Sequence, residues 1–212
     1  MQYRPGSMNY LQSFRYENFI YFAVPKNGLI TFADFFRRNG WEWVDLNQCS
    51  QDGTNYTYFS HIRNPHSRHT KGIVEMLKSY FVLEGGIEKV YEVLHQDERI
   101  ARLLMLTVLD QHTIPITTLL PKKIDPYSVH WIPLDHDKYT SEELTNRFFE
   151  EHNIDLRVEK EDRKHQSGGR IKDVQNRIDD LKNTTNHYKG YFTSSILRDD
   201  LMLYDRVVQN IS

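Results

Sequence analysis

Two segments of the sequence combine basic side chains with turn-forming residues, each directly after a short apolar stretch. The first is Val24–Thr31 (VPKNGLIT), in which Lys26 and Gly28 precede an expected helix. A helix N-terminus presents unpaired backbone N–H groups, and glycine lets the backbone approach an anion closely. The segment therefore predicts a phosphate- or sulfate-binding loop. The same residues also make an ordinary turn between a strand and a helix.

The second segment is His61–Gly72 (HIRNPHSRHTKG), which follows another apolar stretch. Arg63 stands where that strand should end, so its guanidinium can lie at the carboxyl edge of the sheet, where open α/β folds bind ligands. Lys71 adds a second positive charge on the following helix. Arg63 and Arg68 could instead pair with surface carboxylates. The occurrence of both segments in this order favours a site for two phosphate groups.

The two segments resemble the motifs of sulfotransferases that use 3′-phosphoadenosine 5′-phosphosulfate, especially the carbohydrate branch that includes heparan and chondroitin enzymes. That family's first motif reads Pro-Lys-Thr-Gly-Thr-Thr-Ser, and its second reads Arg-Asp-Pro followed by Arg and Ser-Gly. The matching residues are Pro25, Lys26, Gly28, Thr31, Arg63, Pro65, Arg68 and Gly72. Asn27, Leu29 and Ile30 depart from the first motif, while Asn64 replaces Asp and Lys71 replaces Ser in the second.

The resemblance implies a role for each matching position and a P-loop-like sulfotransferase fold. Lys26 would contact the phosphosulfate near its bridging oxygen, and Arg63 would bind the 3′-phosphate, with Lys71 able to meet a phosphate as well. The 5′-phosphate would be held by the backbone N–H groups of Asn27, Gly28, Leu29, Ile30 and Thr31. The ligand implied is 3′-phosphoadenosine 5′-phosphosulfate, with adenosine 3′,5′-bisphosphate as product and no metal ion.

Sulfuryl transfer to a hydroxyl also needs a general base, for which histidine and carboxylate side chains are suitable. Asp110, His112 and Pro115 resemble an Asp-x-His-x-x-Pro element of the carbohydrate branch, which makes His112 the leading candidate. The other candidates from the sequence are Glu42, Asp45 and His61.

Two alternative functions remain open. A nucleotide-dependent kinase would need Gly-Lys-Ser or Gly-Lys-Thr at the helix start, whereas Lys26 precedes Gly28 here. A non-catalytic module that binds adenosine bisphosphate would explain the loss of hydroxyl groups at Leu29 and Ile30. The acceptor is expected to be a hydroxyl compound, with carbohydrate as the first class. Thirteen Tyr and eleven Phe also fit a carbohydrate-binding surface, although most of them lie in stretches expected to form the core.

The elements that must position these residues follow from hydrophobic periodicity. Strands are predicted at 18–24, 56–62 and 129–134. Helices are predicted at 29–38, after Pro65, at 86–95, at 97–109, from a capping box at Thr140 and Glu143 to about residue 151, and at 191–208. Strands that alternate with helices predict a three-layer α/β fold with a largely parallel sheet.

Composition limits the remaining possibilities. We expect one domain over residues 1–212, with a polar excursion at about 156–189 that is a linker or a solvated helix. The 27 Lys and Arg residues nearly balance 29 Asp and Glu residues, which argues against nucleic acid or a membrane as partner. Cys49 is the only cysteine, and no long apolar run is present. These features predict a soluble, cytoplasmic protein, and they do not indicate its oligomeric state.

Overall fold

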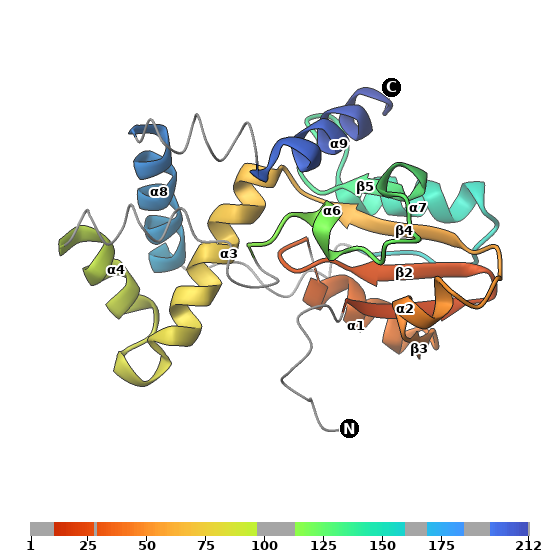
Figure 1. The fold of residues 1–212 in the computed structure, drawn as a ribbon, viewed down its shortest axis with the longest axis horizontal. Helices are drawn as coiled ribbons and strands as arrows, with labels where there is room; N and C mark the ends of the chain where they lie inside the picture. Colours follow the sequence, from red (N-terminus) through yellow and green to blue (C-terminus); the bar gives the residue numbers. More distant parts are fainter. Residues whose placement is uncertain (1–10, 28, 97–112, 160–168, 185–195, 212) are drawn as a thin grey trace. The chain divides into compact units, whose positions relative to one another are not determined.

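The computed structural model describes residues 11–27, 29–96, 113–159, 169–184 and 196–211 (Figure 1). The chain packs as two compact units, and each is described by itself. Unit 1 takes in residues 1–63, 116–165 and 203–212, and unit 2 takes in residues 64–115 and 166–202. None of the described helices is both long enough and apolar enough to cross a lipid bilayer.

Unit 1 is built on a mixed sheet that has five strands within the described residues, in the spatial order β3-β1-β2-β4-β5 (Figure 1). β2 is parallel to β4, and β4 is parallel to β5, whereas β1 is antiparallel to both β2 and β3. The strands are β1 (Gln12–Tyr16), β2 (Phe19–Ala23), β3 (Glu42–Val44), β4 (Thr57–Ile62) and β5 (His130–Pro133). The α/β class and three predicted strands are confirmed. The sequence did not predict β1 and β3. The sheet is mixed, and not largely parallel as predicted, because β1 pairs antiparallel with both of its neighbours.

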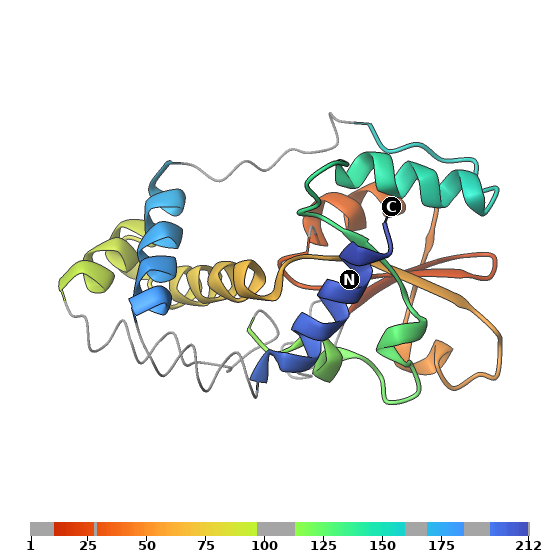
Figure 2. The same ribbon diagram turned by 90° about the horizontal axis from the view of Figure 1, so that it is seen from above.

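Helices α1 (Leu29–Arg38) and α7 (Ser141–Glu151) lie on the same side of this sheet (Figure 2). Their aromatic side chains pack on those of the central strands. The Tyr21 and Phe36 rings lie 4.3 Å apart, and the Phe59 and Phe148 rings lie 4.5 Å apart. Full burial of side chains of this size stabilises the fold by roughly 1.5–3 kcal/mol each. The predicted bounds of α1 and the predicted capping box of α7 are confirmed.

The opposite face of the sheet presents Phe22 and Trp131, whose rings lie 5.6 Å apart. Trp131 Nε1 donates a hydrogen bond of 2.7 Å to the Pro126 carbonyl of the 3₁₀ helix η2 (Pro126–Ser128). The Arg206 guanidinium, from the C-terminal part of α9 (Arg198–Gln209), lies over the Tyr127 ring of η2. Elements therefore cover both faces of the sheet. The short helices α2 (Leu46–Cys49) and α6 (Ile116–Leu119) complete the described part of unit 1.

Unit 2 is helical within the described residues and comprises α3 (Pro65–Tyr80), η1 (Val82–Glu84), α4 (Ile87–Gln96), α8 (Gly169–Thr184) and the start of α9. Its core is formed by Ile73, Val74, Leu77, Val90, Leu94, Val174, Ile178 and Leu181. Residues 169–184 fall in the segment expected to be a linker or a solvated helix. They form a helix whose apolar side is buried against α3 and α4. The helix predicted at 97–109 lies outside the described residues.

Candidate functional site

The loop after β2 has the features of a type II turn that leads into α1. The Asn27 N–H donates a hydrogen bond of 3.0 Å to the Val24 carbonyl, so the turn places Pro25 and Lys26 at its two central positions. Lys26 has φ +66°, a conformation that glycine and asparagine adopt more readily at this position. A lysine there costs on the order of 1 kcal/mol or more. Two residues after this turn, α1 begins at Leu29.

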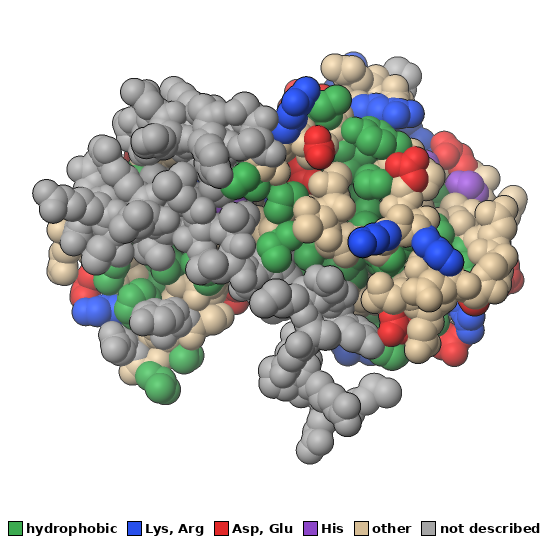
Figure 3. All heavy atoms as spheres, viewed as in Figure 1, with side chains coloured by type: hydrophobic (Ala, Val, Ile, Leu, Met, Phe, Trp, Pro, Cys, Tyr) green, Lys and Arg blue, Asp and Glu red, His purple; other side chains and the backbone are tan. Residues whose placement is uncertain are grey.

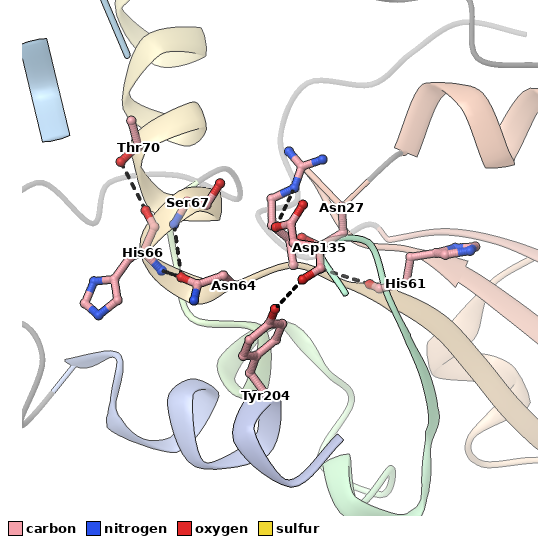
Figure 4. Close-up of polar contacts among 9 residues, drawn as sticks. Asn27, His61, Asn64, His66, Ser67, Thr70, Asp135 and Tyr204 are labelled. Atoms are coloured by element: carbon pink, nitrogen blue, oxygen red, sulfur yellow. Dashed lines mark hydrogen bonds and ion pairs between the residues drawn. The ribbon is translucent and has the colours of Figure 1, made fainter. Parts of the chain in front are cut away.

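Asn27 links this loop to the neighbouring strand (Figure 4). Its side chain is fully buried, and its Nδ2 donates a hydrogen bond of 2.9 Å to the backbone carbonyl of His61. Because β2 and β4 are adjacent and parallel, both end at the same edge of the sheet. The resemblance marks Asn27 as a departure from the family motif. In this chain, the side chain of Asn27, which is longer than the threonine of the motif, fixes the loop to the end of β4. The bond is made at His61, two residues before Arg63.

Arg63 lies at this edge next to Asp135, which follows the end of β5. The Arg63 Nε atom is 3.6 Å from Asp135 Oδ2, and the exposed fractions of the two side chains are 16% and 39%. The Leu134 N–H donates a hydrogen bond of 2.8 Å to the Ile62 carbonyl, so the pairing of β4 with β5 continues beyond the end of β5. Tyr204 Oη donates 3.2 Å to the Asp135 carbonyl (Figure 4). The structure therefore brings Arg63 and the first loop to one edge and adds Asp135, which the sequence did not predict.

The second predicted segment continues into α3, in unit 2. Asn64 caps this helix, since its Oδ1 accepts hydrogen bonds from the His66 N–H at 3.0 Å and the Ser67 N–H at 3.4 Å (Figure 4). Arg68 is 1% exposed, and its Nη1 donates a hydrogen bond of 2.7 Å to the Ile114 carbonyl. Arg68 thus holds a backbone segment inside unit 2. Lys71 is half-buried on α3, and its role as a phosphate contact stays a prediction.

His61, one of the candidate bases, is fully buried and has a structural environment. The Thr145 hydroxyl donates a hydrogen bond of 2.6 Å to the Ser141 carbonyl. Thr145 Oγ1 therefore accepts the hydrogen bond of 3.0 Å from His61 Nε2. Burial raises the pKa of Tyr21, so its hydroxyl stays protonated and donates the hydrogen bond of 3.3 Å to His61 Nδ1. The Phe32 ring stacks on the imidazole at 3.5 Å. Both ring nitrogens are engaged within the core, which disfavours His61 as a base.

The two carboxylate candidates lie at different ends of β3. Glu42 starts the strand and pairs with Arg15 at 2.5 Å. Because β3 and β2 are both antiparallel to β1, the start of β3 lies at the edge opposite Lys26. Asp45 follows the end of β3, and its Oδ1 accepts a hydrogen bond of 2.9 Å from the Asn47 N–H as the cap of α2. Asp45 is therefore at the appropriate edge but already serves a helix terminus.

Other predicted site residues lie wholly or partly beyond what the structure describes. Gly28, Asp110 and His112 lie outside the described residues, so the role of His112 as general base stays a prediction. Leu29, Ile30 and Thr31 form the first turn of α1, whose N–H groups face the loop end of the helix. Only their backbone is described.

A shallow pocket of about 500 Å³ lies along β3 and α2. Glu42 and Asp45 both line it, together with Trp43, whose relative exposure is 49%. An exposed indole beside carboxylates is a usual surface for a sugar ring, since its apolar face can stack while the hydroxyls are hydrogen-bonded. This pocket is where the carbohydrate-binding alternative would apply.

Unit 2 contains a buried lysine that the sequence did not single out. Lys182 of α8 is 4% exposed, and its Nζ donates hydrogen bonds of 2.6 Å to Thr70 Oγ1 and 3.2 Å to the His66 carbonyl. Thr70 Oγ1 in turn donates 2.5 Å to Asp179 Oδ1. Burial lowers the pKa of Lys182 to about 7, and the negative charge of Asp179 opposes this shift. These contacts join α8 to the first turns of α3.

The stability of the protein should therefore depend on pH through Lys182. A lysine in the unfolded chain has a pKa of about 10.4, so between about pH 7 and 10.4 the unfolded state binds more protons at this residue. The unfolding free energy should rise with pH over this window, by up to ~1.4 kcal/mol per pH unit from this group. Urea denaturation from pH 7 to 9 should show a steeper rise for wild type than for Lys182→Met. Lys172→Met, on the exposed side of α8, is the control, and equal slopes in all three proteins would contradict the assignment.

The visible surface of the described part of unit 1 carries basic and acidic side chains interspersed with apolar ones (Figure 3). Basic side chains do not gather in one patch on this face, so an anion that bound here would have to be held by local groups. Comparisons with protein-family models, with curated proteins and with solved structures find no match for this chain.

Proposed function

We propose that the chain is a sulfotransferase that moves a sulfuryl group from 3′-phosphoadenosine 5′-phosphosulfate to an acceptor hydroxyl, with carbohydrate as the first acceptor class. The most direct support is the bond from Asn27 Nδ2 to the His61 carbonyl, which joins the Pro-Lys-Asn-Gly loop to the end of the adjacent parallel strand. Arg63 follows two residues later. Ligands of open α/β sheets bind at this carboxyl edge. A P-loop-like sulfotransferase fold is part of the proposal.

The end of β2 and the end of β4 bind different parts of the donor. The 5′-phosphosulfate lies on the turn at Lys26 and on the N-terminus of α1, and the 3′-phosphate meets Arg63. As the acceptor oxygen bonds to sulfur, the bond from sulfur to the bridging oxygen breaks, and negative charge grows on the departing bisphosphate. A lysine and a helix N-terminus already in place stabilise that charge more than they stabilise the ground state. His112 remains the proposed base that takes the acceptor proton.

Adenosine 3′,5′-bisphosphate is expected to raise the melting temperature more than AMP does, because only the former has the phosphate that Arg63 would bind. A ligand at a hundred times its Kd stabilises the native state by ~2.7 kcal/mol, or roughly 5–10 °C for a chain of this size. Thermal unfolding with each nucleotide measures the difference. Equal shifts would remove the role of Arg63, and hydrolysis of ATP with magnesium would favour the kinase alternative.

Transfer itself is tested with sulfur-labelled donor and a panel of sugars, lipids and phenols. Labelled product from any acceptor would support the enzyme. If wild type binds the bisphosphate and yet labels no acceptor in a broad panel, the non-catalytic binding module becomes the better description.

A further inference from the structure

Arg63 carries a charge that is partly removed from water. Its side chain is 16% exposed, and a guanidinium stays protonated at all ordinary pH values. Such a charge is more stable with an opposite charge beside it. In the ligand-free protein Asp135 supplies one.

The ion pair is asymmetric in burial and loose in geometry. Asp135 is 39% exposed, whereas Arg63 is mostly buried, so the carboxylate can move into water far more easily than the guanidinium can. The separation of 3.6 Å between Arg63 Nε and Asp135 Oδ2 exceeds the ~2.7–2.9 Å of a strong charge-assisted hydrogen bond. A phosphate group can offer the guanidinium shorter bonds than this carboxylate does.

Two hydrogen bonds that do not involve its side chain hold the backbone at Asp135. The Leu134 N–H bonds to the Ile62 carbonyl at 2.8 Å, and Tyr204 Oη bonds to the Asp135 carbonyl at 3.2 Å. Displacement of the carboxylate therefore needs only a side-chain rotation and leaves the strand ends unchanged.

We propose that Asp135 is the resident counter-ion of Arg63, which a ligand phosphate must displace in order to bind. The identity of that phosphate, the 3′-phosphate of the nucleotide, rests on the proposed function. Asp135 positions Arg63 in the free protein and weakens the binding of donor and product alike. It thereby favours release of the bisphosphate product, a step that limits turnover in many enzymes.

The test compares Asp135→Asn with wild type by calorimetric titration of the full chain. Asparagine removes the competing charge, so adenosine 3′,5′-bisphosphate should bind about tenfold more tightly, whereas AMP affinity should not change. Asp135→Glu should return the affinity toward the wild-type value. Asp137→Asn, an exposed carboxylate two residues along the chain, is the matched control and should have no effect. Equal or weaker bisphosphate binding by a folded Asp135→Asn would overturn the proposal.

Titration with inorganic pyrophosphate distinguishes failure of this proposal from failure of the proposed function. If the bisphosphate binds to neither protein and pyrophosphate binds Asp135→Asn about tenfold more tightly than wild type, the sulfotransferase assignment fails and the displacement stands. If the bisphosphate binds both proteins equally, the displacement fails and the nucleotide site stands. If neither the bisphosphate nor pyrophosphate binds to Asp135→Asn, the displacement is overturned as well.

Discussion

Replacing Lys26 with alanine is expected to reduce turnover by about a hundredfold or more, while the affinity for adenosine 3′,5′-bisphosphate changes much less. The ammonium group is proposed to act on charge that develops during transfer, whereas the backbone N–H groups and Arg63 bind the ground state. Steady-state kinetics with an identified acceptor, together with titration of the product, separates the two effects.

Lys26→Gly makes the same test without adding backbone strain. Lys26 has φ +66°, which glycine adopts freely, so this variant should be at least as stable as Lys26→Ala and equally impaired in turnover. Lys138→Ala, an exposed lysine of the same unit, is the control. Near wild-type turnover in both Lys26 variants would show that the first loop is not where the sulfuryl group is transferred.

Replacing Arg63 with alanine should weaken bisphosphate binding by about 1.5–3 kcal/mol, because a charge-assisted bond to phosphate is lost. Asp135 loses its partner in this variant, but its side chain is 39% exposed and can be hydrated, so the domain should remain folded. Titration with the bisphosphate and with AMP measures the change, which should be confined to the bisphosphate.

The double variant Arg63→Ala/Asp135→Asn makes this result more specific. If Asp135 acts only through Arg63, adding Asp135→Asn to Arg63→Ala should bring no further gain in affinity. Arg157→Ala, whose side chain is 75% exposed, controls for loss of a positive charge. Unchanged bisphosphate affinity in folded Arg63→Ala would mean that the second motif has a structural role only.

The sequence predicted the elements whose apolar pattern is long or dense. The run at 19–23 is buried at every position, and the helix at 29–38 has one consistent apolar side. β1 was missed because three of its five residues (QSFRY) are polar, and β3 was missed because it is short. β3 has three residues, two of them exposed, and acquires its strand form by pairing with β1. Such pairing is a tertiary effect that local composition does not encode.

α8 and the site residues illustrate two other limits. The many charged residues of α8 predict a linker or a solvated helix, although Val174, Ile178 and Leu181 recur at helical spacing and all face the core. Asp135 could have been found as the first carboxylate beyond the strand predicted at 129–134. Lys182 gave no signal, because its burial depends on Thr70 and His66, more than a hundred residues earlier.

That long separation along the chain has a consequence for synthesis. Thr70 and Asp179, which bond across α3 and α8, are 109 positions apart. At a translation rate of roughly 5–20 residues per second, α3 and α4 leave the ribosome roughly 5–20 s before α8 can cover them. During this interval the apolar sides of α3 and α4 have no α8 to pack against, so the nascent chain is expected to be a client of ribosome-associated chaperones until α8 emerges.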